Sequence, residues 1–446
     1  MNYSKNHQQW IEALKTDFEG KKRLWQGSLQ SYQNKIRQTQ LEHFSHFLDK
    51  GFPSDKNPYW KFTNINSFLK SVFSLKKVSP TSFEDTSHVS FFSLPQSHKI
   101  HFHNGVLKES SLKNLPEGVQ FCKWEDLTPD FPAWAWIKQT LKKKGDGFYH
   151  LAGALPSCGY VLFIGKMDLP LHIHFSFDES FQGDRSSVCS SLWNLRNFIF
   201  LTEQADITFI ESVSTSKPML VNSVTSVKTS QDSSLKWLHI DQGQSDSFYL
   251  NQVHCDMEEL SSMNRLGFSL GSGLSRDTVE VWHLGEKAHS VLLGLSILKQ
   301  KVLRDQRFYV HHLQKEGYSR QFSRGVLNDQ AKNVFHGKVH VDSKATQTDC
   351  AQSAKNLLLS STADAYTQPE MEINCGEVKA QHGATTGPLS RDEIFYLQSR
   401  GLEYRAAVEF LIMAYITDVL NQFPDKNLVQ HLTQDIWESK NRYLNL

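Results

Sequence analysis

The stretch that decides the fold runs from Asn333 to Gly401 and reads NVFHGKVHVDSKATQTDCAQSAKNLLLSSTADAYTQPEMEINCGEVKAQHGATTGPLSRDEIFYLQSRG. Short runs of β-type residues follow one another in it, and turn residues separate them. The last of these runs contains His382. After it, Ser390 and Glu393 form the S-x-x-E pattern of a helix N-terminus. The stretch therefore predicts the end of a long β region, followed by helices.

The β pattern extends back to about residue 98. In LHIHFSF, Leu171, Ile173 and Phe175 point to one face, and His172 and His174 point to the other, as in a strand with one dry and one wet face. Residues 160–385 contain no long amphipathic helix pattern, which disfavours a parallel βα fold. Short strands at near-regular spacing fit a sandwich, a barrel or a β-helix. The length of the region favours a solenoid, because a solenoid grows without a wider core.

Helical patterns flank this β region. Trp10, Leu14 and Phe18 recur at helical spacing within residues 5–50. After Ser390, one helix ends at Gly401, a second covers about 403–423, and a third covers about 427–442. The second is apolar on most of its surface, which predicts burial on more than one side.

The expected organisation has three parts. Residues 1–95 form a helical region with a linker at 76–95, residues 96–388 form the β core, and residues 389–446 form a C-terminal helical region. The segment Trp60, Lys61, Phe62, Thr63 follows the first helices, and we interpret it as an aromatic anchor that packs them onto the core.

Composition excludes several classes of function. The formal charge of the 446 residues is +1, so no overall field attracts nucleic acid or an anionic membrane. The N-terminus lacks the apolar segment of a signal peptide, and no apolar run is long enough to span a membrane. We expect a cytoplasmic protein. Its six cysteines are scattered without a C-x-x-C pair, which disfavours a disulfide framework or a zinc ribbon.

Few residues form a pattern that predicts a metal site or a nucleotide-binding site. His172 and His174, like His101 and His103, lie at i, i+2, but a metal site needs a third ligand that the local sequence does not supply. No phosphate-binding glycine loop is present, so any ATP must be bound by another subunit.

Cys375 and His382 form a more specific pair. We expect a tight turn at Cys375 and Gly376 to place the two on neighbouring rungs, with ligand types that suit iron. The alternative is that Cys375 only occupies a turn and His382 only bonds a carbonyl.

Five short segments of the opening stretch carry a resemblance: FHGKVHVDSKATQT (335–348), NLLLS (356–360), PEMEI (369–373), VKAQHGATTG (378–387) and IFYLQSRG (394–401). In this order they resemble the SufB/SufD family of iron–sulfur cluster assembly proteins. The resemblance implies a mainly β fold, a right-handed parallel β-helix flanked by N-terminal and C-terminal α-helical regions. It also implies a non-catalytic scaffold subunit of the SUF system, with SufB and the SufC ATPase as partners.

Individual residues divide the family into branches. His382, Gly383, Ala384 and Thr385 match an H-G-A-T segment that is similar to the SufD branch, whereas SufB members usually have H-E-A-T and a cysteine where Leu397 stands. Many SufD members have a cysteine at the position of Ala380, and this chain lacks it.

The resemblance implies that His382 lies at the contact with SufB, where a transient iron–sulfur cluster forms, and that it could ligate iron. Cys375 lies nearby without a matching family role. The resemblance places the SufC contact after Ser390, with Arg391, Asp392, Tyr396 and Arg400 as candidate contact residues. It also suggests a reduced flavin in the assembled complex, and leaves open a homodimer of the isolated chain.

Two other functions stay open at this point. A β-helix carbohydrate-active enzyme would need clustered carboxylates on an exposed groove, and no such cluster is visible in the sequence. A SufB-like homodimeric scaffold would bind a cluster alone.

Overall fold

The computed structural model describes residues 5–25, 31–54, 56–65, 69, 72–75, 92, 94–108, 115–116, 118–178 and 189–439. The linker expected at 76–95 and the chain end after residue 439 therefore lie almost wholly outside the described residues.

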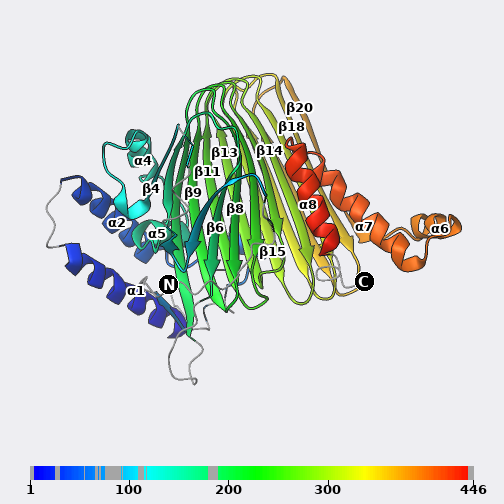
Figure 1. Ribbon diagram of the computed structural model, residues 1–446, viewed down its shortest axis with the longest axis horizontal. Helices are drawn as coiled ribbons and strands as arrows, with labels where there is room; N and C mark the ends of the chain where they lie inside the picture. Colours follow the sequence, from blue (N-terminus) through cyan, green and yellow to red (C-terminus); the bar gives the residue numbers. More distant parts are fainter. Residues whose placement is uncertain are drawn as a thin grey trace.

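The centre of the protein is a parallel β-solenoid made of two facing sheets (Figure 1). Successive strands alternate between the sheets, so each turn contributes one strand to each, and this confirms the expected β-helix. Sheet A contains β4 (Val119–Lys123), β5 (Tyr160–Ile164), β7 (Cys189–Leu201), β9 (Met219–Thr229), β11 (Phe248–Met257), β13 (Leu274–His283), β15 (Leu303–His312), β17 (Lys332–Val341) and β19 (Asp364–Ile373), with β1 (Val72–Leu75) beside β7. Sheet B contains β3 (Val106–Leu107), β2 (His98–His103), β6 (Leu171–Phe177), β8 (Asp206–Thr215), β10 (Ser234–Gln242), β12 (Ser262–Ser269), β14 (His289–Leu298), β16 (Tyr318–Leu327), β18 (Thr348–Leu358) and β20 (Val378–Pro388).

The turns are unequal in length, which hides the repeat in the sequence. Ser234 pairs with Ser262, Ser262 with His289, and His289 with Tyr318, so successive turns advance by 28, 27 and 29 residues. Six of the corners from sheet A to sheet B contain one residue with positive φ: Gln204, Asp232, Leu260, Lys287, Glu316 and Gln347. Their N–H groups donate to the corner of the next turn, as Leu260 does to the carbonyl of Glu286, so the backbone ladder continues around the bend.

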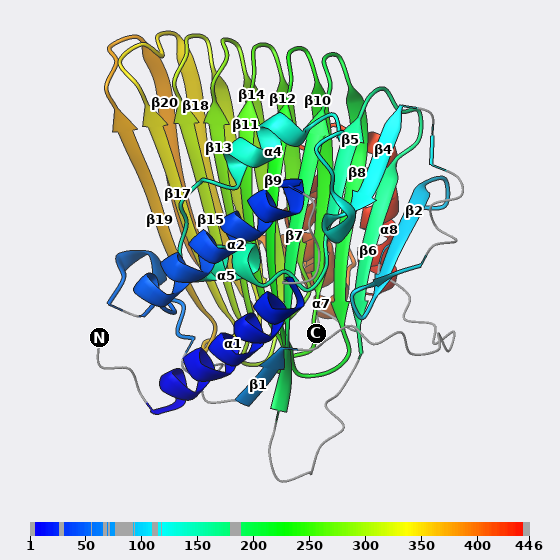
Figure 2. The same cartoon turned by 90° about the vertical axis from the view of Figure 1, so that its left-hand side faces the viewer.

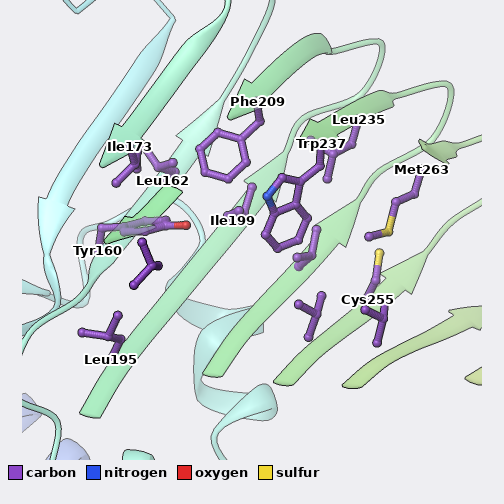
Figure 3. Packing of buried hydrophobic residues seen from close by; sticks show 14 of the residues in the cluster. Tyr160, Leu162, Ile173, Leu195, Ile199, Phe209, Leu235, Trp237, Cys255 and Met263 are labelled. Carbon is purple, nitrogen blue, oxygen red and sulfur yellow. The ribbon is translucent and has the colours of Figure 1, made fainter. Parts of the chain in front are cut away.

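Apolar side chains from the two sheets fill the interior of the first turns. Figure 3 shows Phe209 and Trp237 of sheet B facing Tyr160 and Ile199 of sheet A. Alternate residues of each strand point inward, as the period of two requires. This packing is the core of the molecule.

Charged and polar side chains replace part of this core in the middle turns. Arg265 Nη1 and Nη2 donate to the two carboxylate oxygens of Asp277 at 2.9 and 3.0 Å, and Arg304 Nη2 donates to Asp277 at 3.2 Å. All three side chains are buried. Burial alone would raise the pKa of Asp277, but the two guanidinium groups outweigh it and hold the pKa below its usual value.

The N-terminal helices cover the outer face of sheet A (Figure 2). They are α1 (Lys5–Leu24), α2 (Ser31–Lys50), η2 (Pro58–Trp60), η4 (Trp124–Asp126), α4 (Trp134–Thr140) and α5 (Gly147–Ala154). The expected anchor is confirmed: Trp60 is buried, the guanidinium carbon of Arg276 lies 4.0 Å from its ring centre, and Thr63 donates to Asp305. The short helices between residues 124 and 154 were not expected within the β core.

The C-terminal helices pack against sheet B. They are α6 (Arg391–Ser399), α7 (Tyr404–Leu420) and α8 (Lys426–Glu438). Figure 1 shows α7 and α8 lying across the strands, whereas α6 projects beyond the last turn. The expectation that the second of these helices is buried on more than one side was wrong: Ile412 and Ile416 face the sheet, but Phe410 is 56% exposed. Among the described helices, none is long and apolar enough to cross a membrane.

Candidate functional site

The last turn of the solenoid ends in two strands that no described strand covers. β19 and β20 each pair on one side only, with β17 and β18 respectively. Almost every residue of β20 is exposed. His382 lies in the middle of this strand, in register with Gln352 of β18. Because Gln352 points into the solenoid and in-register side chains share a face, the His382 side chain projects over the open end of the interior.

Cys375 lies at the corner between these strands and is half-buried. It packs with Met371 and Val378 against Cys350 and Val339. The expected placement of Cys375 and His382 on neighbouring rungs was wrong, because the strands that flank the corner belong to opposite sheets. A solenoid corner crosses from one sheet to the other, whereas a tight turn would have joined neighbours within one sheet.

Cys350 is a buried thiol on the turn before Ala380, the position at which many members of the SufD branch have a cysteine. Cys350 is in register with Ala380 and is 1% exposed. Burial, with a smaller contribution from Asp349, raises the pKa of the Cys350 thiol to about 11. The thiolate is the nucleophilic and metal-binding form of cysteine, so this environment keeps Cys350 inert at neutral pH.

The candidate partner-binding residues are all exposed on α6. Ser390 Oγ accepts the N–H of Glu393 at 3.3 Å and confirms the predicted N-cap. Arg391 and Asp392 lie in the first turn, and Arg400 Nη2 donates to the hydroxyl of Tyr396 at 3.2 Å. Exposure fits the predicted role without testing it.

Sequence reasoning missed an apolar surface on the same helices. On α6, Phe395 is 72% exposed and Tyr396 is also exposed, and on α7, Tyr404 is 63% exposed and Phe410 is also exposed. We call these four residues the α6–α7 aromatic patch. The signal was present in the sequence, because two aromatic residues sit beside Ile394 on a helix that buries only Ile394.

The histidine pairs of the first turns contact serine hydroxyl groups. His172 and His174 are buried, which corrects the expected wet face, and both rings lie 2.8 Å from Ser212 Oγ. His101 and His103 contact Ser176 in the same way. No group of three or more metal-ligating side chains suited to a metal ion occurs among the residues that the structure describes.

Several carboxylates lie on the outer face of sheet A, where they form ion pairs with basic side chains. Glu280 lies 2.9 Å from His254 Nδ1 and 3.2 Å from His311 Nε2. Burial would raise the pKa of Glu280, but these two imidazoles outweigh it and lower the pKa. Lys338 of β17 contacts both Glu370 and Glu372 of β19. The sequence did not reveal this cluster because its members come from five different turns.

Comparison with known proteins matches the same part of the molecule. Residues 183–415 match the family model described as SUF system FeS cluster assembly, SufBD core domain. An iron–sulfur cluster assembly SufBD family protein of Synechocystis is 27% identical over 86% of this chain and 86% of its own length. The chloroplastic protein ABCI7 of Arabidopsis thaliana is 24% identical over 85% of this chain and 81% of its own length.

A shorter match is to the iron–sulfur cluster assembly protein SufD of Escherichia coli, which is 30% identical over 37% of this chain and 39% of its own length. The family model covers more than half of the chain, and its span holds the solenoid strands from β7 to β20, the open last turn and α6. The chain therefore belongs to the SufB/SufD family of SUF iron–sulfur cluster assembly proteins.

Proposed function

We propose that this chain is the SufD-type subunit of a cytoplasmic SUF complex, a non-catalytic scaffold that pairs with SufB and binds the SufC ATPase. Gly383 and Leu397 support the SufD branch, because SufB members usually have glutamate and cysteine at these positions. The iron–sulfur cluster is the cargo of the complex, and ATP hydrolysis belongs to SufC.

The open last turn is the observation that carries the proposed pairing with SufB. An uncovered strand presents free N–H and C=O groups, which favour the addition of a further strand, and proteins usually block such an edge. Here β20 has eleven residues, almost all of them exposed, and carries only one charged residue, Lys379. Pairing with a second solenoid at this edge would bury it and would place His382 at the interface.

The α6–α7 aromatic patch supports the proposal that SufC binds to α6 and α7. Interfaces are enriched in aromatic residues and arginine, and their binding energy is concentrated in a few such side chains. Phe395 and Tyr396 of the α6–α7 aromatic patch lie on α6, which begins with Arg391, ends next to Arg400 and projects from the solenoid (Figure 1).

His382 is the chain's candidate ligand for cargo iron. Its imidazole is exposed at the proposed interface, and one imidazole supplies one ligand, so SufB would provide the others. Cys375 is half-buried and packs near Cys350 and Val339, so it is a weaker candidate than His382. A reduced flavin remains part of the proposed complex, with no residue of this chain assigned to it.

His382→Ala tests the role in cluster assembly. In a complex reconstituted with SufB and SufC, we expect this variant to assemble normally and to lose most of the cluster yield, measured by absorption of the anaerobically purified complex. His431→Ala on α8 is the matched control. Normal cluster yield from an intact complex containing the His382 variant would contradict the role.

Phe395→Ser with Tyr404→Ser tests the SufC contact. Deletion of the C-terminal helices would be a poor test, because α7 and α8 cover Leu238, Phe268 and Leu293 of sheet B. We expect the double variant to co-purify with SufB but to lose one SufC copy. Tyr59→Ser removes an aromatic residue exposed to 52% elsewhere and should change nothing. Unchanged SufC content in the double variant would remove α6 and α7 from the contact.

The other functions have less support. The carboxylates of Glu280, Glu370 and Glu372 are held in ion pairs, which does not favour a carbohydrate-active site. A homodimeric scaffold would use the same open edge, and a cluster-loaded homodimer obtained without SufB would favour it over the SufD assignment.

A further inference from the structure

A groove runs along the corners from sheet B to sheet A, on the side of the solenoid opposite the corners that lead from sheet A to sheet B. Its volume is about 870 Å³, which lies within the range of small-molecule sites. We call it the corner groove. It is lined by Phe62, Asn64, Ser245, Phe248, Gly273, Leu274, Lys301, Val302, Leu303, Gln330, Lys332 and Thr362.

The floor of the corner groove is the continuation of a row that the N-terminal helices cover elsewhere. Leu220 of β9 pairs with Phe248 of β11, which pairs with Leu274 and then with Leu303 of β15. Leu220 is buried under the helices, whereas Phe248 and Leu303 are only partly buried. The N-terminal helices therefore cover Leu220 but leave Phe248 and Leu303 partly open to solvent, and these apolar side chains form the floor of the corner groove.

Two lysine side chains, those of Lys301 and Lys332, lie at one end of this apolar floor. Lys332 continues the row after Leu303, and Lys301 lies at the preceding corner. Both side chains are exposed, and neither forms an ion pair with a carboxylate of the described residues. The opposite corners differ, because there Lys287 lies 3.7 Å from Glu316 and Lys315 lies 3.4 Å from Glu286.

We propose that the corner groove binds an amphipathic organic anion. The apolar body lies on Phe248, Leu274 and Leu303, and the anionic group lies between Lys301 and Lys332. Gln330 lines the same end, and its side-chain amide can donate a hydrogen bond to an anionic oxygen. The shape and charge of the groove define this chemistry: a charged ligand without an apolar part would leave the floor exposed, and a neutral one would leave both lysines without a counter-charge.

Titration of the full-length chain with 8-anilinonaphthalene-1-sulfonate, an aromatic anion, tests the proposal by fluorescence. We expect saturable binding that dodecanoate displaces. Lys301→Gln with Lys332→Gln should weaken binding by about tenfold, since two cations next to the anion are removed. Lys287→Gln with Lys315→Gln is the matched control, because it makes the same change in net charge at the opposite corners and should leave the affinity unchanged.

Two further arms separate this site from binding elsewhere. Leu303→Ser should weaken dodecanoate binding while the melting temperature stays close to that of the unaltered chain. Added salt should weaken binding to the unaltered chain more than to the Lys301/Lys332 variant. Equal loss of affinity in both lysine pairs would show non-specific attraction and overturn the proposal. Probe binding unaffected by the Lys301/Lys332 change, as expected for adsorption to the α6–α7 aromatic patch, would also overturn it.

Discussion

Asp277 is a fully buried carboxylate between Arg265 and Arg304. Its ionised form is required there because each guanidinium carries a permanent charge. Removing one partner of a buried ion pair leaves an uncompensated charge, which costs far more than the pair itself contributes.

We therefore expect Asp277→Asn to lower the free energy of unfolding by about 3–5 kcal/mol, measured by urea denaturation. The control is Asp206→Asn, which breaks an exposed pair with Lys236 at 2.8 Å and should cost less than about 1 kcal/mol. Similar losses in the two variants would mean that water reaches the interior of the solenoid.

At the scale of elements, α6 depends on its cap rather than on packing. It has nine residues, buries only Ile394, and begins at Ser390, whose Oγ accepts the N–H of Glu393. Short helices are marginal in water without tertiary contacts. The element proposed to contact SufC is thus held in place by a local hydrogen bond.

Ser390→Ala should cost about 1 kcal/mol of helix stability, which raises amide hydrogen exchange in residues 391–395 by about fivefold. The melting temperature of the whole chain should not change, because α6 adds little to the core. Ser399→Ala, at the other end of the helix, removes only a bond to the carbonyl of Tyr396 and serves as the control. Unchanged exchange in residues 391–395 would show that packing, not the cap, holds α6.

At the scale of the whole molecule, several imidazoles are buried in the neutral form. Burial is the main reason that the pKa values of His43, His172 and His312 fall to about 3. In the unfolded chain these groups take up a proton near pH 6.5, whereas in the folded chain they do not until about pH 3. Falling pH therefore favours the unfolded state throughout this interval.

We expect stability to be constant above about pH 7.5 and to fall as the pH drops from 6.5 towards 3. Each of the three imidazoles should contribute a loss of about 1.4 kcal/mol at pH 5.5. Melting temperatures at half-unit pH steps measure this. His312→Asn should remove about 1.4 kcal/mol of the loss at pH 5.5, and a melting temperature that stays constant from pH 7 to pH 5 would contradict the neutral state of these side chains.

The sequence by itself determined the main elements of this protein. Period-two runs such as LHIHFSF gave strands, the spacing of Trp10, Leu14 and Phe18 gave the first helix, and Ser390 with Glu393 gave the start of α6. The β-helix itself rested on the resemblance, since turns of 27 to 29 residues carry no repeat visible by eye. These features are local, so neighbouring residues are enough to specify them.

The contacts and the burial of the side chains depend on the tertiary structure. His172 and His174 occupy a strand face that the alternation marks as wet, yet both are buried. Cys375 and His382 are close in sequence but flank a corner between two sheets, whereas His382 and Gln352 are thirty residues apart and in register. In a solenoid the neighbours of a residue lie a full turn away, so burial, ion pairs and the open edge at β20 depend on how turns stack, which no single segment of sequence records.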